Sequence, residues 1–157
     1  MAVVQNSYSE THRKAVAGMV ANMTNYDADT GIVETAAGIG FGVAVSQGTA
    51  DDGILIGASA AAKFRGISVR DITLEPGDED KYQQYANISV LTEGDIWVTT
   101  GGAVNAGEDV TFASTTGVLS SAGTSGTQFA ISGARWMTSA GSGELAVVRL
   151  SGHLPSA

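Results

Sequence analysis

The chain has 157 residues, 43% of them hydrophobic and 15% charged, and a formal net charge of −8; one domain of this size can bury a core without disulfides or metals. Its eight Lys and Arg residues are scattered, so the chain lacks the basic face that binding to a nucleic acid or an anionic membrane requires. It contains no cysteine, which excludes a disulfide scaffold, a thiolate metal site and a cysteine nucleophile.

The first 30 residues differ in pattern from the rest, and we expect residues 1–30 to form an extended N-terminal arm. Their apolar residues are spaced as on one face of a helix or of an irregular arm; they include Val16, Met19, Val20 and Met23. Gly18 weakens the helical alternative, because glycine costs a helix about 1 kcal/mol relative to alanine. The arm either packs on its own domain or reaches a neighbouring subunit. No apolar signal segment is visible in it, so we expect the chain to fold in a cytoplasm.

From residue 31 onward, apolar residues alternate with small or polar ones, which predicts short strands. Residues 38–45 would turn four apolar side chains to one face and mostly Gly or Ala to the other; the four are Ile39, Phe41, Val43 and Val45. Further strands are predicted at residues 32–36, 54–57, 64–73 and 87–92. We therefore expect residues 31–157 to form a single β-rich domain.

A Gly-rich corner is predicted between two strands at residues 95–100 and 109–113. Val104 is expected to plug back into the core, because it is the large apolar residue of an otherwise small and polar segment. Asn105 and Gly107 are expected to take the positive φ angles that a tight reversal requires. The other strands would be laid around this corner.

Two more strands are predicted near the C-terminus. The strand over residues 127–137 would place Phe129, Ile131 and Met137 on one face, and Ala130, Ala134 and Trp136 on the other. The strand over residues 144–150 is apolar on both faces, which is typical of the centre of a sandwich or of a subunit contact. About ten short strands at this spacing predict an all-β fold, either a β-sandwich or a small jelly-roll-like β-barrel.

No group of residues has the spacing of a catalytic, cofactor or metal site. His12 and His153 lie near opposite ends of the chain, without a second metal ligand at a suitable spacing. Asp27 and Asp29 resemble half of a calcium loop, but Gly38 stands where the loop requires Glu, so we expect a turn there instead. We therefore expect no enzymatic activity, no cofactor and no metal.

Several segments, in their order and spacing, resemble one known family. The segment AVAGMVA at residues 15–21 is similar to an apolar, Gly-containing block in that family's N-terminal arm, and IGFGVAV at residues 39–45 resembles one of its strands. Four more segments resemble the C-terminal half of that family's proteins; they are residues 94–98, 103–108, 131–136 and 146–150. The family is that of the capsid cement, or head decoration, proteins of tailed bacteriophages.

The resemblance implies a β-rich structural protein on the outer capsid surface of the virion, made in the cytoplasm of the host bacterium. It would bridge subunits of the major capsid protein and stabilise the head against the pressure of the DNA inside. It also implies self-association, as a dimer or a trimer. Contacts with the capsid or between subunits are expected on the arm and at an exposed aromatic residue; these are Val16, Met19, Val20, Met23 and Tyr26.

Two other classes of protein share parts of this pattern. A carbohydrate-binding or adhesin-like β-sandwich module would present aromatic residues side by side, and Trp97 and Trp136 are candidates for such a platform, although we expect them in the core or at an interface. A lipoyl- or biotin-carrying domain has a similar corner between strands. Its modified lysine lies at a hairpin tip, whereas the nearest lysine here, Lys81, lies well before the corner.

Overall fold

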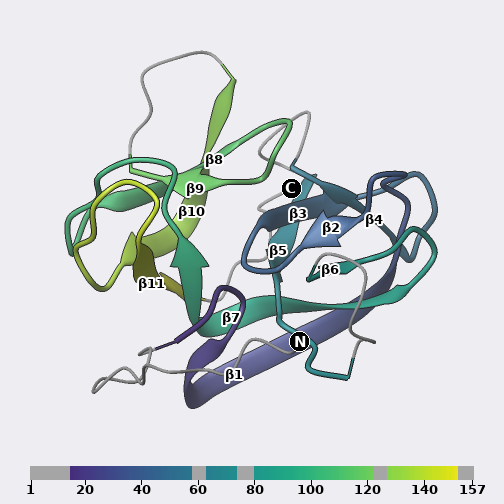
Figure 1. Ribbon diagram of the computed structural model, residues 1–157, viewed down its shortest axis with the longest axis horizontal. Coiled ribbons are helices and arrows are strands. Elements are labelled where there is room, and N and C mark those ends of the chain that lie inside the picture. The colour runs from purple at the N-terminus through teal and green to yellow at the C-terminus, as the bar shows by residue number, and fades with distance from the viewer. Residues whose placement is uncertain (1–14, 58–62, 74–79, 122–126, 152–157) are drawn as a thin grey trace, which may run out of the picture.

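The computed structural model describes residues 15–57, 63–73, 80–121 and 127–151 (Figure 1). Within these ranges the regular elements are eleven strands, which confirms the prediction of an all-β fold. The first six are β1 (Val20–Val33), β2 (Ile39–Gly40), β3 (Ala44–Gln47), β4 (Gly53–Ile56), β5 (Phe64–Ser68) and β6 (Lys81–Tyr82). The other five are β7 (Asn87–Thr99), β8 (Asp109–Ala113), β9 (Leu119–Ser120), β10 (Gln128–Trp136) and β11 (Leu145–Leu150).

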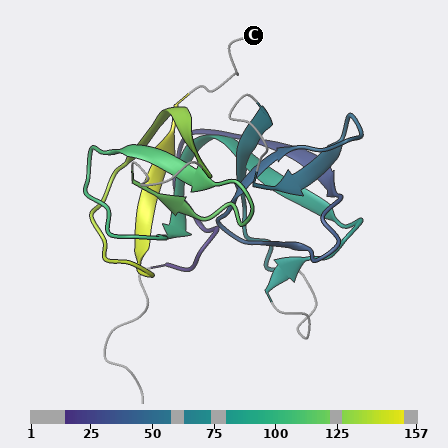
Figure 2. The ribbon, with the colours of Figure 1, turned by 90° about the horizontal axis from the view of Figure 1, so that it is seen from above.

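Nine of the strands form one mixed sheet in the order β1-β4-β3-β5-β7-β11-β10-β8-β9, and β2 pairs with β6. Strand β1 also pairs with β7, so that β1, β4, β3, β5 and β7 follow one another in a ring of hydrogen-bonded neighbours. The remaining strands leave from the other end of β7. The sheet is thus folded into two lobes that share β7 (Figures 1 and 2).

The barrel alternative is therefore wrong, because the nine-stranded sheet does not close into one barrel. The reason is the length of β7, whose 13 residues serve both lobes. It pairs with β1 from Asn87 to Ile96 and with β11 from Gly94 to Thr99. A single barrel would need each strand to serve one ring only.

Each lobe surrounds a cluster of buried side chains. The cluster of the first lobe includes Val33, Ile39 and Tyr82. The larger cluster of the second lobe includes Trp136, which is fully buried, and it continues into the first lobe through Phe64 and Ile67. The rings of Phe64 and Phe112 lie 5.5 Å apart, so aromatic packing joins β5 of one lobe to β8 of the other.

The predicted corner is correct in part. Strand β8 has the predicted bounds, Val104 is buried, and Gly107 has a φ of 91°. The prediction of a positive φ at Asn105 is wrong: its backbone N–H and side-chain amide instead donate to the Glu108 carboxylate, at 3.0 and 2.9 Å. Strands β7 and β8 are not neighbours, since β7 pairs with β11 here and β8 with β9 and β10.

Irregularities in two strands explain further differences from the sequence pattern. Residues 38–45 are interrupted at Gly42, which has a φ of 69°, yet Ile39, Phe41 and Val45 reach the same core cluster as predicted. In β10 the pairing register with β8 shifts between Ala130 and Arg135, and Gly133 has a φ of 77°. The predicted division of faces in β10 is therefore wrong; Ile131, Ala134 and Trp136 are all buried.

The described part of the N-terminal segment is tied to the body. Gly18 donates to the carbonyl of Trp97 at 2.8 Å, and its own carbonyl accepts from the backbone N–H of Arg70 at 2.8 Å. The helical alternative is wrong, because residues from Val20 onward form β1 and pair with β7. Strand β1 continues through residue 30 to Val33. Whether residues 1–30 act as an arm stays a prediction, and residues 1–14 lie outside the described ranges.

Candidate contact surface

Strand β1 contains a four-residue bulge that projects from the sheet. Asn22 is paired with Asp95, and the next pair joins Asp27 to Glu93, so that residues 23–26 lie opposite Gly94 alone. Asn25 has a φ of 53°, which lets the chain turn outward. We call residues 23–26 the β1 bulge. An irregularity of this kind ends regular pairing and redirects side chains.

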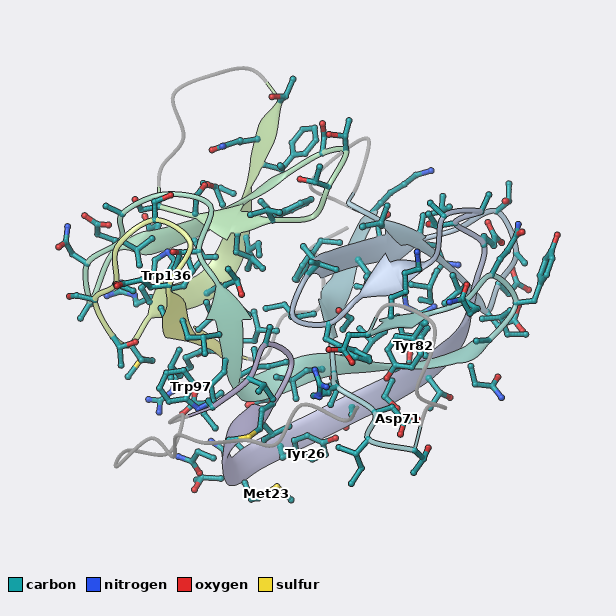
Figure 3. The ribbon with its side chains drawn as sticks, in the orientation of Figure 1. Met23, Tyr26, Asp71, Tyr82, Trp97 and Trp136 are labelled. Atoms are coloured by element: carbon teal, nitrogen blue, oxygen red, sulfur yellow. The ribbon has the colours of Figure 1, made fainter. Side chains whose placement is uncertain are left out.

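The β1 bulge presents hydrophobic side chains to solvent. Met23 is 74% exposed and projects beyond the β1 ribbon, and Tyr26 is 39% exposed (Figure 3). Met19, just before β1, is 39% exposed. A large hydrophobic side chain on a protruding segment costs free energy in water that burial against a partner would recover. The bulge thus has the composition of a contact surface.

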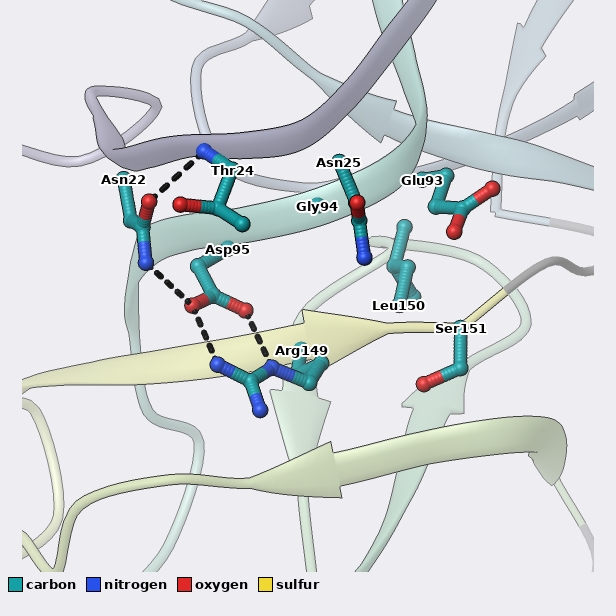
Figure 4. A pocket seen from close by; sticks show the side chains of 9 residues that line it. All are labelled: Asn22, Thr24, Asn25, Glu93, Gly94, Asp95, Arg149, Leu150 and Ser151. Atoms are coloured by element: carbon teal, nitrogen blue, oxygen red, sulfur yellow. Dashed lines mark hydrogen bonds and ion pairs between the residues drawn. The ribbon is translucent and has the colours of Figure 1, made fainter.

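An ion pair lies directly beneath the β1 bulge (Figure 4). The Arg149 Nε donates to Asp95 Oδ1 at 2.7 Å, and Nη2 donates to Oδ2 at 2.8 Å. Asp95 on β7 is buried, whereas the Arg149 side chain on β11 is partly exposed. The hydrogen bonds and the charge of Asp95 raise the pKa of Arg149. Two-point pairing also fixes the orientation of both side chains.

The ion pair is connected to the bulge through Asn22. The Asn22 side-chain amide lies 3.5 Å from Asp95 Oδ2, and its carbonyl oxygen accepts from the backbone N–H of Thr24 at 2.7 Å. These groups border a shallow polar hollow of about 270 Å³, whose floor includes Gly94. Gly94 has a φ of 129°, a backbone conformation that residues with a side chain rarely adopt, so glycine suits this position opposite the bulge.

The five residues predicted as contacts lie along this part of the chain but differ in exposure. Met19, Met23 and Tyr26 are exposed, whereas Val16 and Val20 are half-buried. Sequence reasoning did not find the Asp95–Arg149 pair beneath them. The two residues are 54 positions apart, and only the pairing of β7 with β11 brings them together. The one sign of this pair in the sequence was Arg149, a charged residue within the otherwise apolar strand 145–150.

The two aspartates that resemble half of a calcium loop are part of a strand. Asp27 and Asp29 lie in β1, so the predicted turn is wrong. Asp29 forms an ion pair with Arg65, and Asp80 forms one with Arg70. Among the described residues, no three His, Cys, Asp or Glu side chains are grouped closely enough to hold a metal ion.

Three further observations concern the alternatives raised by the sequence. His12 and His153 lie outside the described ranges. Trp136 is fully buried and Trp97 is half-buried, so the two tryptophans do not form an exposed platform (Figure 3). In the described part of the chain, no helix has the length and hydrophobicity needed to cross a membrane.

The fold is similar to the folds of two chains in solved phage structures. A chain of the solved structure "The capsid of Myoviridae Phage XM1" superposes with a TM-score of 0.75 and 18% identity, over 97% of this chain and 99% of that one. A second solved structure, "The crystal structure of head fiber gp8.5 N base in bacteriophage phi29", has a TM-score of 0.52 and 14% identity, over 80% of this chain and 94% of that one. Both similarities concern the fold. No curated protein matches the sequence.

The sequence itself identifies the family. Residues 4–151 match the family model described as "Structural cement protein (E217 gp24/Pam3 gp6)". The chain therefore belongs to the family of phage structural cement proteins. It is a structural component of a phage capsid and not an enzyme, which confirms the expectation drawn from the sequence segments.

Proposed function

We propose that the protein binds the outer surface of the capsid and bridges subunits of the major capsid protein through the β1 bulge. The observation that carries this proposal is the exposure of Met23 and Tyr26 on a projecting segment braced from below by Asp95 and Arg149. Interfaces are commonly dominated by a few apolar or aromatic anchors set in a rigid surround. Met23, Tyr26 and Met19 are the anchors in this proposal.

The stabilisation follows from mass action. A protein that binds the assembled shell but not free capsid subunits stabilises the shell by RT ln(1 + [L]/Kd) for each site. Burying one Met side chain completely contributes about 1.5–3 kcal/mol. Many identical sites on one shell add these contributions, so a modest energy at each site gives a substantial total.

Self-association as a dimer or a trimer is part of the proposal. Two copies held together would engage two capsid subunits at once, and the second contact would form at a high effective concentration. Light scattering of the purified protein at several concentrations measures this state. A protein that stays monomeric in solution, yet saturates shells, would restrict the proposal to bridging by a single copy.

The experiment that tests the function is attachment to purified shells that lack the protein. We expect saturable co-sedimentation of the wild-type protein and a Kd raised roughly 10-fold or more by the double variant M23A/Y26A, because hot-spot truncations cost at least about 1.4 kcal/mol. The matched control is Tyr85→Ala, since Tyr85 is 76% exposed but lies outside the bulge. Circular dichroism shows whether the variants are folded.

Two results would contradict the proposal. Shells that do not retain the wild-type protein would argue against capsid binding. Equal retention of M23A/Y26A and wild-type protein would leave capsid binding in place but remove the bulge as its contact surface.

A further inference from the structure

The two edges of β1 have different partners. One edge pairs with β7 at positions from Val20 to Ile32. The other edge pairs with β4, and only at Ile32 and Val33. Within the described ranges, the outer edge of residues 26–31 therefore has no strand beside it. The same residues are exposed up to Thr30, so the edge is accessible as well as unpaired.

The direction of the backbone groups follows from the bonds at the end of β1. Ile32 donates its N–H to the Asp52 carbonyl at 2.8 Å, on the side away from β7, whereas Val33 donates to the Ala86 carbonyl at 3.0 Å. Because successive residues of a strand turn their backbone groups to opposite edges, Ala28 and Thr30 face the same outer side as Ile32. The Thr30 N–H already donates to the carboxylate of its own neighbour, Asp29, at 2.8 Å, so the outward groups left for a partner are the N–H and C=O of Ala28 and the C=O of Thr30. Such a row of outward groups is a template for an added strand.

Charge argues against a second copy of this chain as the added strand. Asp27 and Asp29 are exposed on this segment. Arg65 neutralises Asp29 by an ion pair, whereas Asp27 has no ion pair among the described residues. Antiparallel pairing of two β1 edges would bring the acidic segments of both copies together, and like charges in facing positions are destabilising. The net charge of −8 adds to this repulsion. A strand with a Lys or Arg near Asp27 would instead gain a favourable cross-strand pair.

We propose that the outer edge of β1, over residues 26–31, accepts an extended, Lys- or Arg-bearing segment of the major capsid protein as an additional strand. This inference rests on the proposed function, because it takes the capsid protein as the partner. Backbone hydrogen bonds to Ala28 and Thr30 supply affinity, and Asp27 selects a basic side chain. The bulge, which directly precedes this edge, adds apolar contacts at its end.

Hydrogen–deuterium exchange of the full-length protein, free and bound to shells, tests the inference directly. We expect the outward amide of Ala28, resolved with overlapping peptides, to exchange quickly in the free protein and at least about 10-fold more slowly on shells, whereas the amides bonded to β7 exchange slowly in both states. Attachment without slower exchange there would overturn the strand inference and leave capsid binding intact. Failure to attach would overturn capsid binding itself, so the two failures are distinguishable.

Other occupants of the edge give other exchange patterns. Slow exchange in the free protein at every concentration would mean that the chain's own remaining residues cover the edge. Slow exchange that appears only as the free protein is concentrated would mean that a second copy covers it. Either pattern would overturn the proposed occupant.

Substitutions test the backbone and the charge separately. Ala28→Pro removes an outward N–H while sparing the ladder to β7, and we expect attachment weakened at least about 10-fold, corresponding to one lost strand contact. Ala28→Val keeps the N–H and is the matched control. Asp27→Asn is expected to weaken attachment several-fold at low salt and less at high salt. Undiminished attachment of folded Ala28→Pro would overturn strand addition, and undiminished attachment of Asp27→Asn would overturn the basic partner.

Discussion

At the scale of single residues, the Asp95–Arg149 pair links three strands. Asp95 lies on β7, Arg149 on β11, and Asn22 of β1 reaches the same carboxylate. The pair therefore joins the two lobes at the place where the β1 bulge leaves the sheet. A buried carboxylate in this position is stabilising only while its partners remain in place.

We predict that Asp95→Ala lowers the thermal unfolding temperature by several degrees and weakens attachment to shells. The substitution leaves the Arg149 guanidinium without its acceptors and frees the Asn22 side chain that bonds the start of the bulge. Differential scanning calorimetry and co-sedimentation measure the two effects. Asp51→Ala, at an exposed carboxylate, is the matched control; equal unfolding temperatures for both variants would contradict a structural role of the pair.

At the scale of elements, the β3–β4 connection depends on one carboxylate. Glu34 accepts from the Thr49 hydroxyl at 2.6 Å and from the backbone N–H groups of Thr49 and Ala50, each at 2.8 Å. These hydrogen bonds, that of the Thr49 hydroxyl first, lower the pKa of Glu34 below its ordinary value of 4.5. A side chain at Gly53 would occupy the place of the Glu34 carboxylate and displace it from these hydrogen bonds.

The pKa shift of Glu34 predicts a pH dependence of stability. A carboxylate whose pKa is lower in the folded state stabilises the fold fully above its unfolded value of 4.5 and loses that contribution as the pH falls through the folded value. We therefore expect Glu34→Gln to be less stable than the wild type at pH 7, and the difference to shrink below about pH 4.5. Urea unfolding at pH 7 and pH 3 measures it. A difference of the same size at both pH values would assign the effect to shape and not to charge.

At the scale of the whole molecule, the two lobes cannot separate without breaking β7. They share this strand, and the Phe64–Phe112 contact packs one lobe against the other. We therefore predict one cooperative unfolding transition, with equal calorimetric and van't Hoff enthalpies. Two resolved transitions in a calorimetric scan would show that each lobe folds as an independent unit. A protein that unfolds as one unit can hold two capsid subunits together without one lobe opening first, as the proposed bridging requires.

Local patterns in the sequence determined several features of the protein. Alternating apolar residues predicted the all-β class and the bounds of β8, and the isolated valine at position 104 was correctly placed in the core. The ordered segments predicted the family that the match over residues 4–151 confirms. Such features depend on neighbours in the chain, because side-chain alternation and turn chemistry act over a few residues.

Tertiary structure alone decided how the strands pair and therefore what the contact surface is. Met23 and Tyr26 were predicted as contacts, but their projection depends on a register shift against Gly94, about 70 positions further along the chain. The brace formed by Asp95 and Arg149, and the unpaired edge of β1, likewise depend on which strand lies beside which. Periodicity shows which side chains share a face of a strand, but the choice of neighbouring strand is made by long-range packing and hydrogen bonding, which leave no local pattern in the sequence.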